Sequence, residues 1–174
     1  GWAYHNVPGL SLPAHRNDTE QRARFIAEHT SLQDRSVLDL GCAVGGISGA
    51  LAQHGAHVVG VDYDEESIAV ARSLDAPGCA FYALAITKDN LAAMLPVDVC
   101  IWLSQWQWLL KQAGWQTATD MLRYISERAD ELWFDTPLGG MASAVMTQHG
   151  LTTCDDIMRL LHEHTRYTHI INHG

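Results

Sequence analysis

The sequence predicts an α/β fold with a doubly wound, mostly parallel sheet and helices on both of its faces. Short apolar runs, typical of strands buried on both sides, alternate with amphipathic stretches of helical spacing. The runs lie far enough apart to be joined by helical crossovers, which parallel neighbours require. A length of 174 residues fits one domain, and no internal repeat or linker interrupts the alternation.

In the first half of the chain, helices and strands are expected to alternate. The run Asn17-Asp18-Thr19-Glu20 is typical of a helix start, because an Asx side chain precedes an acid. Ile68, Ala71 and Leu74 recur at helical spacing behind two acids, which suit the positive end of a helix. The expected strands are short runs rich in valine and leucine. The expected elements are a helix over 17–29, a strand over 36–40, a helix over 46–54, a strand over 57–61 and a helix over 65–74.

The second half continues this alternation. Thr153 precedes two acids, which predicts a capped helix that ends near Thr165. Strands are expected over 79–84, 97–103, 131–135 and 167–171, and a long helix over 116–129. Residues 1–16 are expected to be an irregular N-terminal segment, because Pro8, Gly9 and Pro13 interrupt it.

Charge and hydropathy exclude several classes of partner. The chain carries 20 acids and 11 bases, a formal net charge of −9, whereas duplex nucleic acid and anionic membranes attract basic surfaces. No window holds the roughly 18 apolar residues of a membrane span. Residues 1–6 lack the features of a secretory signal. We therefore expect no nucleic acid, no membrane span and a cytoplasmic location.

Cysteine and histidine spacing argues against a metal site. The four cysteines are scattered without a C-x-x-C pair, which fits a reduced chain. Among the ten histidines, no pair has helical i, i+4 spacing with an acidic third ligand. We expect no metal.

The most informative segment is a strand followed by a glycine-rich turn and a helix, residues 37–46. Small residues in the turn allow a ligand to approach the backbone, and the helix start offers free amides. Asp62 ends the second strand about 20 positions after Gly41, where an acid can accept hydrogen bonds from a ribose. These features predict a nucleoside-containing ligand at the carboxyl ends of the strands. The alternative is that Asp39 caps the turn and Asp62 caps the next helix.

Two cofactors fit such a turn. Gly41, Ala43 and Gly46 match a loosened dinucleotide pattern, but Asp39 would face a pyrophosphate with like charge. An acid at this position suits a ligand with an ammonium group, such as S-adenosylmethionine. The charge argument favours S-adenosylmethionine over NAD.

The segment Val37-Leu38-Asp39-Leu40-Gly41-Cys42-Ala43-Val44-Gly45 resembles the first motif of the class I S-adenosylmethionine-dependent methyltransferases. The segment Val58-Val59-Gly60-Val61-Asp62 resembles their second motif. The resemblance implies a Rossmann-like S-adenosylmethionine-binding domain over residues 17–174, without the usual seventh strand. It implies that Asp39 and Gly41 lie near the methionine, that Asp62 binds the ribose and that Tyr63 lies against the adenine. The cofactor-binding candidates are Asp39, Gly41, Cys42, Ala43, Gly45, Asp62, Tyr63, Ile86, Ser104 and Trp106.

A subgroup is more similar still, the methyltransferase domains of bacterial O-antigen chain-terminating methyltransferase-kinases. The similarity lies in Gly41-Cys42-Ala43, in the residues 51–62 that lead to Asp62, and in Leu103-Ser104.

Two departures from the family pattern bear on function. Many members have an acid after the third strand, whereas this chain has Leu84-Ala85-Ile86-Thr87, where Ile86 could pack on an adenine. After the fourth strand the subgroup has a histidine pair, whereas this chain has Gln107-Trp108. If those histidines bind the methyl acceptor or take up its proton, this chain either has a different acceptor or does not catalyse methyl transfer.

Five of the six tryptophans lie between Trp102 and Trp133. Trp102 and Trp133 fall on expected strands and suit the core. Trp106 follows the fourth strand at the edge where open α/β proteins bind ligands, so it either stacks on a ligand or packs under the next helix. Trp108 is expected to be structural.

Asp135, His15 and His149 are candidate bases by position. Asp135 ends the fifth strand and has a loop-capping role as its alternative. Arg16 and Arg22 precede the sheet and could meet a carboxylate or an anionic acceptor, or form a solvated helix face.

These patterns lead to two functional hypotheses. The first is in-line methyl transfer from S-adenosylmethionine to a small-molecule or saccharide acceptor. The second is a non-catalytic S-adenosylmethionine-binding or interaction module of a larger protein. An incomplete sheet edge would favour a homodimer or a neighbouring domain there.

Overall fold

The computed structural model describes residues 3–5, 14–16, 18–138 and 143–172. Its centre is a five-stranded sheet in which all neighbouring strands are parallel, which confirms the expected fold class. The order across the sheet is β5-β4-β3-β6-β7, so the chain winds outward from β3 in both directions. The strands are β3 (Ser36–Leu40), β4 (His57–Asp62), β5 (Cys79–Ala83), β6 (Val97–Leu103) and β7 (Ala129–Asp135).

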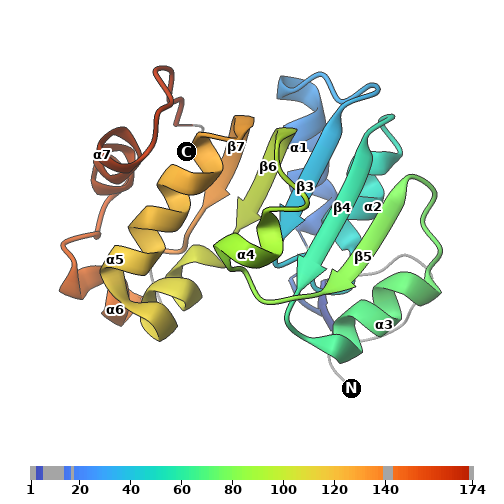
Figure 1. The fold of residues 1–174 in the computed structure, drawn as a ribbon, viewed down its shortest axis with the longest axis horizontal. Coiled ribbons are helices and arrows are strands. Elements are labelled where there is room, and N and C mark those ends of the chain that lie inside the picture. The colour runs from blue at the N-terminus through green and yellow to red at the C-terminus, as the bar shows by residue number, and fades with distance from the viewer. Residues whose placement is uncertain (1–2, 6–13, 17, 139–142, 173–174) are drawn as a thin grey trace.

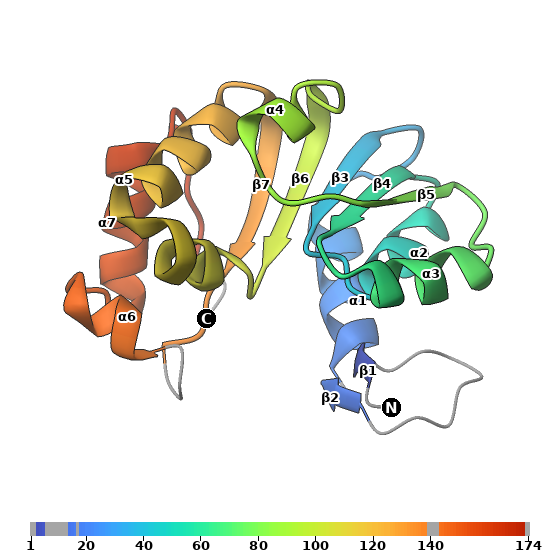
Figure 2. The ribbon, with the colours of Figure 1, turned by 60° about the horizontal axis from the view of Figure 1, so that its bottom comes forward.

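Helices cover both faces of this sheet (Figures 1 and 2). One face carries α1 (Thr19–His29), α2 (Gly46–Ala52) and α3 (Glu65–Ser73). The other face carries α4 (Lys88–Leu91), α5 (Trp106–Ser126), α6 (Ser143–Gln148) and α7 (Cys154–His164).

Alternating side chains of β3 enter the two cores. Val37 packs with Ile26 and Ile47 under α1 and α2. Leu38 and Leu40 point the other way, into the larger cluster under α5. Burial of each such side chain stabilises the fold by about 1.5–3 kcal/mol, so a strand covered on both sides is apolar at nearly every position.

The expected irregular N-terminal segment contains two short strands. β1 (Ala3–His5) and β2 (Ala14–Arg16) pair in parallel as a separate two-stranded sheet. The breakers Pro8, Gly9 and Pro13 lie outside the described residues.

The expected sixth strand over 167–171 is wrong. Ile170 packs against the core and Ile171 is exposed, so the alternation exists, but a strand also needs a backbone partner. The segment is held instead by a side chain, because the Tyr167 hydroxyl donates to the Ala129 carbonyl at 3.0 Å. Among the described strands, β7 pairs with β6 alone, and the expected pairing of its other edge with a second copy or another domain stays a prediction.

The helix after β6 begins ten residues earlier than expected. α5 starts at Trp106 and breaks at Gly114, whose φ of 81° and ψ of 172° are not helical. Trp106, Gln107 and Leu110 are buried along its first two turns, a helical spacing that the expected boundary at residue 116 missed.

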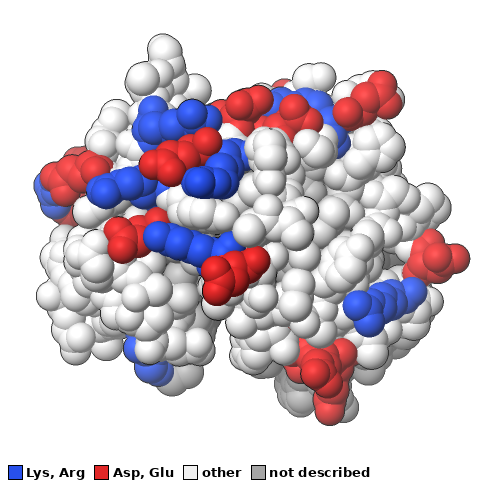
Figure 3. All heavy atoms as spheres, viewed as in Figure 1, with Lys and Arg blue, Asp and Glu red and all other residues white. Residues whose placement is uncertain are grey.

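Acidic and basic side chains are intermixed on the face that carries α4 and α5 (Figure 3). Within the part of the chain that the structure describes, no helix is long and apolar enough to cross a membrane.

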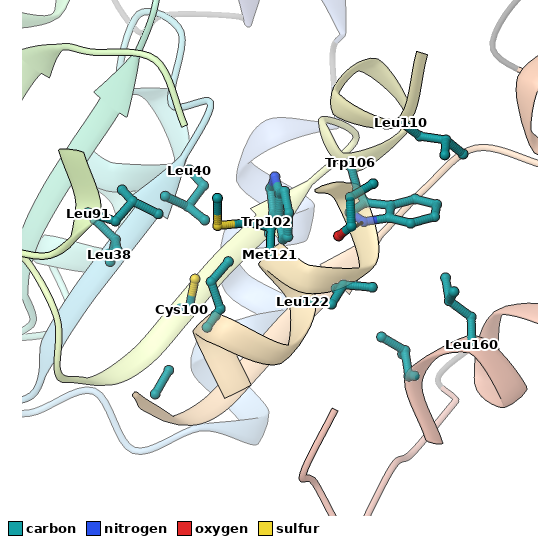
Figure 4. Packing of buried hydrophobic residues seen from close by; sticks show 14 of the residues in the cluster. Leu38, Leu40, Leu91, Cys100, Trp102, Trp106, Leu110, Met121, Leu122 and Leu160 are labelled. Carbon is teal, nitrogen blue, oxygen red and sulfur yellow. Dashed lines mark hydrogen bonds between the residues drawn. The ribbon is translucent and has the colours of Figure 1, made fainter. Parts of the chain in front are cut away.

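Trp106 belongs to the larger core (Figure 4). Its side chain is 0% exposed, and its indole N–H donates to the Ala118 carbonyl at 3.0 Å. The proposed stacking of Trp106 on a ligand is therefore wrong, because the ring is enclosed between α5 and the sheet. Trp108, expected to be structural, is 39% exposed and has the Lys111 ammonium 5.4 Å from its ring centre.

The two tryptophans provide a matched test of this packing. Trp106→Ala should destabilise the fold by about 3–5 kcal/mol, because it empties a core site and removes a buried hydrogen bond. Trp108→Ala should cost less than about 1 kcal/mol, since it removes only an exposed ring and a cation–π contact. Urea unfolding of both variants measures the difference, and equal losses would contradict the assignment of Trp106 to the core.

Candidate functional site

The parallel register brings five strand ends to one edge of the sheet. Leu40 pairs with Val61, and Asp62 pairs with Ala83. On the other side, Leu103 pairs with Asp135. The residues that follow these strands therefore meet at the carboxyl edge, where open α/β sheets bind ligands.

The glycine-rich turn after β3 is anchored to the neighbouring strand. The N–H groups of Gly41 and Cys42 both donate to the Val61 carbonyl, at 2.8 and 3.0 Å. The chain then reverses with φ of 77° at Gly41, 49° at Ala43 and 78° at Gly45. Gly45 donates to the Cys42 carbonyl at 2.9 Å and leads into α2. Left-handed φ values favour glycine, so the turn depends on these small residues.

The turn has no room for larger side chains. A Cβ at Gly41 would overlap the Gln105 side chain, and one at Gly45 would lie 2.7 Å from Phe81 Cζ. At both glycines the close neighbour is a side chain of the protein itself, so packing alone already requires small residues here. The expected approach of a ligand to this backbone stays a prediction.

Asp62 is tied to the same turn. Its side chain is 6% exposed, its Oδ2 accepts from the Ala43 N–H at 2.9 Å and its Oδ1 accepts from the Asp64 N–H at 3.0 Å. The alternative that Asp62 caps the next helix is wrong, because Asp64 is the N-cap of α3 (Glu65–Ser73) and Asp62 holds the turn before it. Each carboxylate oxygen has two acceptor sites, so these two bonds leave capacity for the hydroxyls of a ligand.

Asp39 is a buried acid beside the turn. It is 4% exposed, and its Oδ2 accepts from the Ser48 hydroxyl at 2.6 Å. Burial raises the pKa of Asp39 from 3.8 to about 6, against the Ser48 hydrogen bond, which lowers it. The Asp62 charge raises the pKa further and the Arg22 charge lowers it. Burial destabilises the ionised form of Asp39, so a cation that binds to this carboxylate would be attracted strongly.

The remaining turn residue, Cys42, acts as a small apolar wall. It is buried against Gly60, and burial raises the pKa of its thiol far above the ordinary value. A neutral thiol is unreactive, and the expectation that Cys42 contacts the cofactor stays a prediction.

The ends of β6 and β7 are joined by a hydrogen-bond network. The Ser104 N–H donates to the Asp135 carbonyl at 2.8 Å. Gln107 donates to the Ser104 carbonyl at 2.7 Å and accepts from the Thr136 hydroxyl at 3.2 Å. Gln107 is buried, and its two hydrogen bonds link the end of β6 to the residue that follows β7.

The candidate bases occupy different environments. Asp135 forms an ion pair with Arg22, and this pair connects α1 to the end of β7. The carboxylate that Arg22 was expected to bind is therefore one of the chain's own side chains. His149 stacks on Trp115 with ring centres 4.7 Å apart. The side chains of His15 and Arg16 lie outside the described residues, although their backbone forms β2.

Two candidates for the adenine differ in exposure. Tyr63 follows Asp62 directly and is 73% exposed. Ile86, beyond β5, is half-buried against the core. An exposed ring and an apolar side chain on neighbouring strand ends could enclose a flat base.

Within the described ranges, no group of three or more His, Cys, Asp or Glu side chains could hold a metal ion.

The chemistry of the two acids would suit a molecule with a cation at one end and a diol at the other. Asp39 and Asp62 flank the bend, and Ser48 and Ala43 orient their carboxylates. Sequence reasoning missed Ser48, Gln105 and the structural role of Gln107. Ser48 lies nine positions after Asp39, a spacing that carries no recognisable motif.

Comparison with known proteins finds similar sequences over the part of the chain that contains the glycine-rich turn. A family model described as a methyltransferase domain matches residues 37–126. The ubiquinone biosynthesis O-methyltransferase of Stutzerimonas stutzeri (strain A1501) is 41% identical over 76 residues, which are 43% of this chain and 33% of that protein. The enzyme of the same name from Coxiella burnetii (strain Dugway 5J108-111) is 46% identical over 68 residues, 39% of this chain and 29% of that protein. This chain therefore spans about a third of the curated relatives it matches.

Solved structures share the fold. The crystal structure of monomeric WbdD, a bifunctional kinase-methyltransferase, is 25% identical with a TM-score of 0.78, and the match covers 98% of this chain and 43% of that one. The N-terminal domain of EvdMO1, crystallised in the presence of SAH (S-adenosylhomocysteine) and D-fucose, is 17% identical with a TM-score of 0.63, and the match covers 76% and 57% of the two chains. The second likeness concerns the fold alone.

The raised pKa of Asp39 makes the stability of the fold depend on pH. Between pH 3.8 and 6 the unfolded chain loses the Asp39 proton while the folded chain keeps it, so this residue lowers stability as pH rises. Asp39→Asn removes the effect. The stability of the variant relative to wild type should therefore increase by about 2 kcal/mol from pH 4.5 to pH 7. Urea unfolding of both proteins at the two pH values measures this, and a constant difference would contradict the buried charge.

Proposed function

This chain belongs to the methyltransferase domain family, and on that basis we propose that it binds S-adenosylmethionine and transfers the methyl group to a small-molecule or saccharide acceptor. The observation that carries the proposal is the pair of buried acids, Asp39 and Asp62, on either side of an anchored glycine bend. A diphosphate on this bend would face the Asp39 charge, which disfavours NAD.

Different residues of the chain would bind different parts of S-adenosylmethionine. Ionised Asp39 attracts the ammonium of the methionine part, and Asp62 accepts hydrogen bonds from the ribose hydroxyls. Tyr63 and Ile86 lie where the adenine would follow, on the ends of β4 and beyond β5. The backbone of Gly41 and of its neighbours borders the methionine.

S-adenosylmethionine supplies an already activated methyl group, so the protein's part is to align the acceptor and to exclude water. A base is needed only for an acceptor that must lose a proton. Of the candidate bases, Asp135 lies at the carboxyl edge of the sheet, and its pairing with Arg22 keeps it in place.

The acceptor class is inferred from relatives and from charge. Two relatives are named for O-methylation in ubiquinone biosynthesis, and EvdMO1 was crystallised with D-fucose. The net charge of −9 disfavours a polyanionic acceptor.

A non-catalytic binding module is the second candidate. The observation that favours it is the replacement of the subgroup's histidine pair by a buried Gln107 and by Trp108, neither of which can accept a proton. Such a module would keep the pocket and lack turnover.

Binding of S-adenosylhomocysteine should depend on the ionisation of Asp39. With a pKa of about 6, about one Asp39 carboxyl in ten is charged at pH 5, so affinity should fall about ten-fold between pH 7.5 and pH 5. Asp39→Asn should bind weakly at both pH values and lose the dependence. Calorimetric titration measures both proteins, and an affinity of wild type that is flat over this range would argue against Asp39 as the ammonium partner. Failure of wild type to bind at millimolar ligand would exclude the function itself.

Turnover separates the enzyme from the module. Incubation with S-adenosylmethionine and pools of saccharides, phenols and other small metabolites should release S-adenosylhomocysteine above the rate without acceptor. Asp62→Ala should reduce the release at least ten-fold, because the ribose hydrogen bonds are lost. Tight binding of S-adenosylmethionine together with no release from any pool would favour the module.

A further inference from the structure

Gln105 lies against the glycine bend, at the start of α5. A Cβ at Gly41 would overlap its Cγ and would lie 2.6 Å from its Cδ and 3.0 Å from its Nε2. The carboxamide of Gln105 therefore covers the Cα of Gly41, two residues beyond Asp39. No motif of the sequence marked this residue as part of the site.

The carboxamide is available for a ligand. Its neighbours in the chain are engaged: Trp106 donates to the Ala118 carbonyl, and Gln107 bonds to Ser104 and Thr136. Gln105 itself is half-buried, and within the described part of the chain its side chain makes no hydrogen bond. Its polar atoms are not among the buried ones that lack a partner, so they reach solvent and are accessible to a ligand.

The backbone holds this side chain in place. The Gln105 carbonyl accepts from the Trp108 N–H at 3.0 Å, which closes the first turn of α5. Before it, Ser104 has a φ of 57° and is bonded to the Asp135 carbonyl. A side chain on so fixed a backbone needs little further ordering to bind a ligand.

The chemistry of the proposed ligand calls for a donor at this point. An amino-acid group carries an ammonium and a carboxylate, and the Asp39 charge attracts the first but repels the second. A neutral carboxamide can donate to the carboxylate without opposing Asp39. An arginine or lysine there would bind the carboxylate but would also pair with Asp39.

Building on the proposed function, we propose that Gln105 is a binding residue for the amino-acid end of the methyl donor. Its NH2 group donates to the carboxylate while Asp39 receives the ammonium. The two residues, from β3 and from the start of α5, thus recognise the two charges of one zwitterion.

The test compares two ligands that differ only in this end. S-adenosylhomocysteine carries the amino-acid group, and 5′-methylthioadenosine lacks it. In calorimetric titrations, Gln105→Ala should weaken S-adenosylhomocysteine about ten-fold or more and leave 5′-methylthioadenosine within about two-fold. Gln105→Glu keeps the shape and removes the donors, so it should weaken S-adenosylhomocysteine at least as much. Gln116→Ala is the matched control, since Gln116 is an exposed residue of α5 that bonds to Asp120.

The outcomes distinguish this proposal from the function on which it rests. Equal weakening of both ligands, or an unchanged preference for S-adenosylhomocysteine in both Gln105 variants, would overturn the role of Gln105 alone. Wild-type protein that binds neither ligand would overturn the proposed function, and the role of Gln105 with it. Far-UV circular dichroism of each variant verifies that the fold is intact.

Discussion

The site depends on one carbonyl group that holds the chain reversal after β3. Both Gly41 and Cys42 donate to the Val61 carbonyl, and one residue later Asp62 accepts from Ala43. These three bonds join the end of β3 to the end of β4 and fix the bend relative to Asp62. A preorganised arrangement of this kind lowers the entropic cost of binding, because little has to be ordered when a ligand arrives.

The same arrangement places a destabilised charge in the interior. Asp39 is held away from water by α1 and α2, and one serine hydroxyl compensates its charge only in part, as its raised pKa of about 6 shows. Functional sites commonly carry such a stability cost, which a ligand of opposite charge relieves. The extensive core under α5, which includes Trp102 and Trp106, supplies stability that can offset this cost.

The second half of the sheet contributes to the site through backbone positioning. The ends of β6 and β7 are locked together by Ser104, Gln107 and Thr136, and the Arg22–Asp135 ion pair adds α1 to the same edge. As a result, the first turn of α5 starts beside the glycine bend and carries Gln105 onto it. Gln107 thus has a structural part in the site, since its side chain links the ends of the two strands.

The sequence alone determined the α/β class, the parallel sheet, the glycine bend and its two acids, because these features follow from local periodicity and from motifs of contiguous residues. Tertiary structure decided which side chains are free. Trp106, a ligand candidate by position, is enclosed in the core, whereas Trp108 is exposed, and the sequence offers no means to distinguish their directions. The partners of Asp39 and Asp135 come from other elements of the chain, and so does Gly41, against which Gln105 lies. Contacts between residues far apart in sequence depend on how the helices pack. The alternation at 167–171 forms no strand because, among the described residues, no strand pairs with it, and Tyr167 is bonded to Ala129 through its hydroxyl instead.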